Sequence, residues 1–280
     1  METLIMSEAD GTRRRPFRDF ITRYLDEVVP NHRSKREYIF LIRLLKHPIA
    51  DIAFPTEEDF SNYRNERLLD VQGSTVLREL AVMSSICTTA VKEWRWLKEN
   101  PLKAVKKPKQ GKPRDRRVSD EEVEILKKAC SYDENFPKTK LSRTVHAFMF
   151  AIETGMRASE IVGLTWDNID FEKRTAFLPM TKNGEPRKVP LSARAIELLK
   201  QLPVESERAF NLTEVTTIFC KVKNKTDLKD LHFHDSRHEA ITRMAKKVDV
   251  LSLARIVGHK RINQLMTYYN ESAEDLALKL

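Results

Sequence analysis

Four separated segments of this 280-residue sequence place basic residues and tyrosines beside predicted helix boundaries or at a predicted turn. They read TGMRASEIVGLTW around Arg157, TKNGEPRKVPL around Lys182, LHFHDSRHEA around His234 and Arg237, and IVGHK followed by MTYYN. A guanidinium group can bind two oxygens of one phosphate, and cations near a phenol favour the phenolate as a nucleophile. These residue types together suit chemistry on a phosphate ester.

One of these segments also allows a different interpretation. His234 and Arg237 are three residues apart at the start of a predicted helix, so both project from one face and can meet one phosphate. However, His232, His234 and His238 form an H-x-H-x₃-H pattern that could supply three zinc ligands. Because no fourth ligand and no catalytic glutamate motif accompanies these histidines in the sequence, we favour the phosphate site and predict neither a metal nor a cofactor.

The four segments resemble, in the same order, the signature boxes of the tyrosine recombinase (phage integrase) family. Tyr268 follows His259 by nine positions, as the family pattern requires. The resemblance covers the chain after residue 117 and, more loosely, the region before residue 101, which is similar to the family's core-binding domain. It implies a site-specific DNA recombinase, or integrase, that cleaves and rejoins DNA strands without a metal ion.

The resemblance also implies a role for each phosphate-binding residue. Arg157 and Arg237 would bind the non-bridging oxygens, on which negative charge increases during attack. Glu160 lies one helical turn after Arg157 and would orient it. His234 would meet the same phosphate as Arg237, and His259 would donate a hydrogen bond to it.

Two further roles are implied for the cleavage step. Lys182 would protonate the leaving 5′ oxygen, although Lys173 and Lys188 lie nearby in the sequence. Tyr268 would be the nucleophile that forms a covalent 3′-phosphotyrosine intermediate. Its neighbour Tyr269 would pack in the core, because adjacent residues of a helix point about 100° apart.

The elements that carry these residues predict a mainly α fold with a small antiparallel β-sheet. Residues 1–15 are expected to form an N-terminal tail, and residues 16–100 an all-α core-binding domain. Apolar residues at helical spacing predict four helices within this domain, in 17–28, 39–45, 60–69 and 74–94. Thr56 with Asp59 forms a capping signal for the third.

Residues 118–280 are expected to form the α+β catalytic domain. Ser119 with Glu122 predicts a capping box, and the apolar helix at 141–154 is expected to stop at Gly155. Residues 169–191, around an Asn-Gly pair, predict antiparallel strands. Further helices are predicted at 192–202, 215–222, 234–247, 250–257, 262–269 and 273–280.

A basic, proline-containing segment at 101–117 predicts a linker between the two domains. Residues 101–119 include eight basic residues, one acidic residue and three prolines, which are excluded from helix interiors. We expect the linker to bind DNA phosphates through Lys106, Lys107, Lys109, Lys112, Arg114, Arg116 and Arg117. The alternative is a charge run that is only solvated.

Composition agrees with a DNA-binding protein of the cytoplasm. The formal net charge is +9, which attracts polyanions, and only 7 glycines favour long helices. The sequence contains no apolar run of membrane-spanning length and no signal-peptide core. Its three cysteines show no CxxC spacing, so we expect free thiols and a cytoplasmic, nucleoid-associated protein.

The family resemblance implies double-stranded DNA as partner, and a homotetramer on paired DNA sites with a Holliday-junction intermediate. A host DNA-bending protein or a directionality factor could assist, and no membrane partner is expected. Only about 16 residues precede the first predicted helix, too few for an arm-binding domain, so we expect a shorter or truncated family member. The rival functions are a non-catalytic DNA-binding regulator on the same fold and a type IB topoisomerase.

Overall fold

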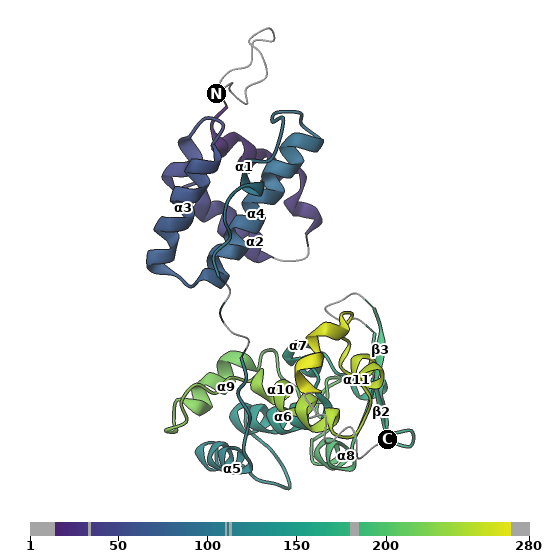
Figure 1. The fold of residues 1–280 in the computed structure, drawn as a ribbon. Coiled ribbons are helices and arrows are strands. Elements are labelled where there is room, and N and C mark those ends of the chain that lie inside the picture. Colours follow the sequence, from purple (N-terminus) through teal and green to yellow (C-terminus); the bar gives the residue numbers. More distant parts are fainter. Residues whose placement is uncertain (1–14, 33–34, 110, 112–113, 180–184, 270–280) are drawn as a thin grey trace, which may run out of the picture. The chain divides into compact units, whose positions relative to one another are not determined.

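The chain is mainly helical and divides into two compact units, residues 1–113 and 114–280 (Figure 1). The computed structural model describes residues 15–32, 35–109, 111, 114–179 and 185–269. Within these ranges no helix is both long enough and apolar enough to cross a membrane. Arg114, Arg116 and Arg117, which fall in the predicted linker, belong to the second unit.

In its described residues, the first unit contains four α-helices around one apolar core. They are α1 (Phe17–Glu27), α2 (Lys35–Leu44), α3 (Glu57–Asp70) and α4 (Gly73–Lys92), with short 3₁₀ helices at Val29–Asn31, Pro48–Asp51 and Pro101–Lys103. The capping signal at α3 is confirmed: the Asp59 carboxylate accepts from the Thr56 backbone N–H at 2.7 Å. Phe17, Phe20 and Phe60 are fully buried, as expected for apolar residues at helical spacing.

The second unit combines helices with a three-stranded antiparallel sheet, as predicted. Its helices are α5 (Asp120–Ala129), α6 (Lys140–Thr154), α7 (Ala158–Val162), α8 (Ala193–Lys200), α9 (Thr216–Lys223), α10 (Asp235–Ala245) and α11 (Val250–Val257). The sheet has the order β1 (Ile169–Asp170), β2 (Thr175–Leu178), β3 (Arg187–Pro190). The described part of this unit also includes the 3₁₀ helices η5 (Trp166–Asn168), η6 (Ile262–Gln264) and η7 (Met266–Tyr268).

Helix α6 forms the centre of this unit and packs against α5, α8, α9 and α10 (Figure 1). It ends at Gly155, as predicted, in the left-handed conformation with φ +64°. A side chain there would be strained, and its Cβ would lie 3.6 Å from that of Ala240 on α10. The close approach of α6 and α10 brings the Gly155 carbonyl to the start of α10.

The strands at 169–191 form as predicted, and β3 returns from the hairpin that contains Lys182. Residues 180–184, including Lys182, lie outside the described residues. Ala176 on β2 pairs with Val189 on β3, and both side chains are buried. Because side chains alternate between the two faces of a strand, Arg187 shares the buried face of β3 with Val189.

The predicted helix at 262–269 is wrong. The segment forms η6 and η7, in which backbone N–H groups bond three residues back, such as Tyr268 N–H to the Leu265 carbonyl at 2.9 Å. Leu265 is fully buried, whereas Ile262 and Met266 are exposed. A single buried side chain provides no continuous apolar stripe to hold an α-helix against the core. The predicted tail helix at 273–280 lies outside the described residues.

Candidate active site

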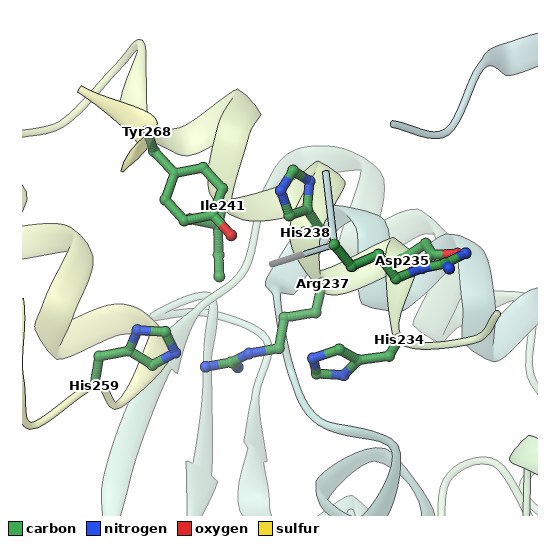
Figure 2. A pocket seen from close by; sticks show the side chains of 8 residues that line it. His234, Asp235, Arg237, His238, Ile241, His259 and Tyr268 are labelled. Carbon is green, nitrogen blue, oxygen red and sulfur yellow. The ribbon is translucent and has the colours of Figure 1, made fainter. Parts of the chain in front are cut away.

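A pocket of about 240 Å³ lies at the N-terminal end of α10. It is lined by Arg114, His234, Asp235, Arg237, His238, Ile241, His259 and Tyr268. Figure 2 shows the Arg237 guanidinium between the imidazole rings of His234 and His259, with the Tyr268 ring projecting towards the same space. The fold therefore brings together four of the predicted catalytic residues, from the start of α10, the end of α11 and η7.

Arg237 is the most deeply buried cation of the pocket, with an exposed fraction of 3%. Its Nη2 donates to the Val257 carbonyl at 2.6 Å, and its Nη1 donates to the Gly155 carbonyl. Burial and the positive charge of Arg157 lower its pKa to about 9, so the guanidinium remains protonated at neutral pH. A bound anion would oppose this shift, because its negative charge favours the protonated guanidinium.

Arg157 does not line the pocket, but hydrogen bonds connect it to the pocket wall. It precedes α7, where the Glu160 carboxylate accepts from its backbone N–H at 2.8 Å and from its Nη1 at 2.9 Å. Its Nη2 lies 3.4 Å from the Gly258 carbonyl, directly before His259. Glu160 therefore bonds to Arg157 through both the backbone and the side chain of the arginine.

A third guanidinium, which the sequence interpretation missed, completes this network. Arg187 Nη1 and Nη2 donate to the two oxygens of Glu160 at 2.7 and 2.9 Å. Burial alone would raise the pKa of Glu160, but the hydrogen bonds from Arg187 and Arg157 outweigh it and lower the pKa to about 2. The available signal was the alternation in β3, which puts Arg187 on the same face as Val189 and so requires a buried partner.

The two histidines of the predicted set differ in environment. His259 is half-buried, and its Nδ1 has no hydrogen-bond partner among the described residues. Burial and the charges of Arg237, Arg157 and Arg187 lower its pKa to about 4, so its imidazole is neutral at pH 7 and keeps one N–H donor. His234 is exposed and directly precedes α10.

The adjacent tyrosines are directed to different partners. Tyr268 is half-buried in the pocket, with its ring centroid 5.1 Å from that of His238. Burial raises its pKa, and the positive charge of Arg237 opposes that rise. The Tyr269 hydroxyl instead donates to the Val248 carbonyl at 2.7 Å. Of the two phenols, only Tyr268 lines the pocket.

The histidines of the zinc alternative do not converge. His232 Nδ1 lies 3.9 Å from carboxylate oxygens of Asp230 and Asp235, whereas His238 packs against Tyr268. In the ranges that the structure describes, no group of three or more histidine, cysteine or carboxylate side chains could hold a metal ion.

Arg114 from the predicted linker forms part of the pocket wall. Its Nε and Nη2 donate to the two oxygens of buried Asp235 at 2.6 and 2.8 Å, and its Nη1 donates to Asp230 at 2.9 Å. Asp235 lies between His234 and Arg237 in the sequence, where an uncompensated carboxylate would repel a phosphate. Arg114 neutralises that charge.

The other two linker arginines also have carboxylate partners in the second unit. Arg117 forms a two-pronged pair with buried Glu239, at 2.6 and 2.9 Å. Arg116 Nη1 lies 3.1 Å from a Glu122 oxygen, beside the confirmed capping box of α5. These guanidinium groups therefore hold the segment that precedes α5 against the second unit.

The lysines of the predicted linker have a different environment. Lys106, Lys107 and Lys109 belong to the first unit and are exposed, while Lys112 lies outside the described residues. Of the two lysines near Lys182 in the sequence, Lys173 is 78% exposed and pairs with Asp170, and Lys188 is exposed on the face of β3 opposite Arg187. Neither of these two lines the pocket.

Comparison with known protein families gives two matches that together cover most of the chain. The model of the phage integrase family matches residues 116–275, and the model of the phage integrase N-terminal domain matches residues 15–109. A putative integrase/recombinase of Haemophilus influenzae is 41% identical over 261 residues, which is 90% of this chain and 86% of that protein. The shufflon-specific DNA recombinase of Escherichia coli is 34% identical over 93% of this chain and 70% of its own.

Solved structures with the same fold include two integrases bound to DNA. The Tn1549 transposon integrase in complex with a circular intermediate DNA superposes with a TM-score of 0.74 at 15% identity, over 95% of this chain and 98% of that chain. The lambda integrase tetramer bound to a Holliday junction superposes with a TM-score of 0.73 at 16% identity, over 91% of this chain and 80% of that chain. These structures show a shared fold, and the family match with its close relatives shows that the chain belongs to the phage integrase family of site-specific tyrosine recombinases.

Proposed function

We propose that this recombinase cleaves DNA through a covalent 3′-phosphotyrosine bond to Tyr268. The observation that carries the proposal is the composition of the pocket, where a half-buried phenol lies beside Arg237, His234 and His259. Around it, Glu160 pairs with both Arg157 and Arg187, while the hydrogen bonds of Arg237 that we observe among the described residues go to backbone carbonyls, so positive charge is in excess. A phosphodiester supplies the missing negative charge.

In the cleavage step, the Tyr268 hydroxyl releases its proton to solvent as its oxygen attacks the phosphorus, and the bond from phosphorus to the 5′ oxygen breaks. Negative charge that develops on the non-bridging oxygens is stabilised by Arg237 and Arg157, whose positions are set before DNA binds. The neutral His259 donates its N–H to the same phosphate. The leaving 5′ oxygen takes its proton from Lys182 and becomes a free hydroxyl.

The joining step reverses this chemistry with a new strand. The 5′ hydroxyl of a second duplex attacks the phosphotyrosine, restores the phosphodiester and releases Tyr268. Exchange of both strand pairs requires four active sites on two duplexes, so we propose a homotetramer that passes through a Holliday junction. The lambda integrase tetramer bound to such a junction, which shares this fold, supports that assembly. A DNA-bending or directionality factor would set the geometry of paired sites, and the activity would reside on the nucleoid.

DNA affinity independent of sequence would come from exposed cations outside the pocket. Lys106, Lys107 and Lys109 are exposed and are therefore available to phosphates. Arg114, Arg116 and Arg117 would contribute less, because each is paired with a carboxylate of its own unit. We propose that the lysines bind the duplex and that the arginines mainly fix the edge of the catalytic unit.

A nicked duplex that carries the recombination site tests the proposal. After cleavage near the nick, a short 5′-hydroxyl fragment diffuses away and the covalent complex accumulates. We expect a protein–DNA band that survives SDS in the presence of EDTA and disappears in the Tyr268→Phe variant. DNA binding without any such band would favour the regulator. Relaxation of plasmids that lack a recombination site would favour the topoisomerase.

A further inference from the structure

We propose that Arg187 is a positioning residue of the active site, which joins the Glu160 carboxylate to the C-terminal end of α11 and so fixes Arg157 and His259 relative to each other. The inference rests on the proposed strand cleavage, because it assigns a residue to that reaction. Arg187 starts β3, 30 residues after Arg157 in the sequence. It follows the hairpin of Lys182, but none of the roles implied by the sequence falls on it.

The Arg187 guanidinium is held in one orientation by three hydrogen bonds. Two parallel bonds of 2.7 and 2.9 Å reach the Glu160 oxygens, and Nε donates to the Ile256 carbonyl at 3.1 Å. Its side chain is 10% exposed and that of Glu160 is 3% exposed, so water competes little with this pair. Glu160 uses the same oxygen, Oε1, to accept from Arg187 and from Arg157.

Three guanidiniums meet the end of α11 at consecutive carbonyls. Ile256 accepts from Arg187, Val257 from Arg237, and Gly258 from Arg157. The last carbonyls of a helix have no partner within the helix and carry its partial negative charge, which makes them suitable acceptors for cations. His259 is the next residue, so its position depends directly on these contacts.

Gly258 reflects the closeness of this packing. It adopts φ +67°, and a Cβ at this position would lie 3.1 Å from Cδ of Arg187 and 3.2 Å from Nε and Nη1. The turn that delivers His259 to the pocket therefore needs a glycine both for its backbone conformation and for the approach of Arg187.

Arg187 acts through its neighbours, because Nε, Nη1 and Nη2 of its guanidinium all donate to Glu160 or to the Ile256 carbonyl. Without it, Arg157 would be the one cation that pairs with buried Glu160 among the described residues, and its guanidinium would turn further towards the carboxylate and away from the phosphate. The end of α11 would also lose one of its three anchors. Displacement of catalytic groups by about 1 Å reduces rates on the order of a hundredfold.

The experiment compares Arg187→Gln and Arg187→Lys with the matched control Arg143→Gln. Arg143 is also a buried arginine of the second unit, with a 9% exposed side chain paired to Glu205 at 2.6 Å, but it lies outside the pocket network. We expect both Arg187 variants to slow covalent complex formation at saturating DNA on the order of a hundredfold, with DNA affinity within about threefold of wild type. Lysine keeps the charge but cannot form the two parallel bonds, so Arg187→Lys should not restore the rate of covalent complex formation. The control should cleave at the wild-type rate per folded molecule.

A sulfur-substituted substrate identifies the group through which Arg187 acts. A 5′-bridging sulfur leaves without protonation, so it rescues defects of the general acid only. We expect no rescue of Arg187→Gln, because its effect falls on Arg157 and His259. Rescue would show that Arg187 serves the Lys182 hairpin and would overturn the inference. Wild-type cleavage rates in Arg187→Gln would also overturn it, whereas absence of a covalent complex from the wild-type protein would reject the proposed function itself.

Discussion

The two adjacent tyrosines offer a test in which activity and stability should separate. The Tyr269 hydroxyl donates to the Val248 carbonyl at 2.7 Å, whereas Tyr268 lines the pocket beside Arg237 and His259. Tyr269→Phe removes a hydrogen bond and leaves that carbonyl without this donor, which should lower the free energy of unfolding by about 1 kcal/mol. Tyr268→Phe removes no protein hydrogen bond that we observe among the described residues, so its free energy of unfolding should stay within about 0.5 kcal/mol of wild type.

For cleavage activity we expect the reverse: Tyr268→Phe should lose it, and Tyr269→Phe should keep it. Tyr268→Phe lacks the nucleophilic oxygen and should give no covalent complex on a nicked duplex, while its DNA affinity remains that of wild type. Tyr269→Phe should still form the complex at a rate close to wild type. Urea denaturation of each variant, with the same protein used for SDS gels, measures both quantities. A covalent complex from Tyr268→Phe, together with its loss in Tyr269→Phe, would refute the assignment of the nucleophile.

Three further predictions concern charge. Arg237→Ala should reduce cleavage per bound complex by roughly a hundredfold or more, as for a lost oxyanion donor, while gel shifts show little loss of affinity. Replacing Lys106, Lys107 and Lys109 with glutamine should lower the slope of log K against log salt by about 0.9 for each phosphate that the protein no longer neutralises; an unchanged slope would place these lysines in solvent. The lowered pKa of Glu160, about 2, should contribute about 3 kcal/mol of stability above pH 5 that disappears as pH falls from 4.5 towards 2. Acid denaturation of Glu160→Gln should lack this component.

Several features of this protein follow from local sequence because they depend on neighbouring residues only. The capping boxes at Thr56 and Ser119 need one side chain and the backbone three residues on, and both form as predicted. The stop at Gly155 needs only a residue that tolerates positive φ. The small antiparallel sheet follows from β-branched and aromatic residues around a turn signal. The family was also recognisable, because the order and spacing of its signature boxes can be read from the sequence without the fold.

The tertiary structure decided what each charge faces. A run of arginines and lysines between two domains predicts phosphate contacts, yet Arg114 and Arg117 pair with Asp235 and Glu239, more than a hundred residues away in the sequence. Arg187 has no role in the sequence interpretation, and only the fold places Glu160 opposite it. An ion pair over such separations depends on how helices and strands pack, which local propensity does not encode.

The geometry of the segment that carries the two tyrosines also depends on tertiary packing. The spacing from His259 selected Tyr268, but the segment was predicted as a helix and forms 3₁₀ turns anchored by Leu265. The partner of Tyr269, the Val248 carbonyl, lies in the loop between α10 and α11. Sequence spacing thus selected Tyr268 as the proposed nucleophile, whereas only the packing of that segment against α10 and α11 showed which phenol bonds to the protein and which lines the pocket.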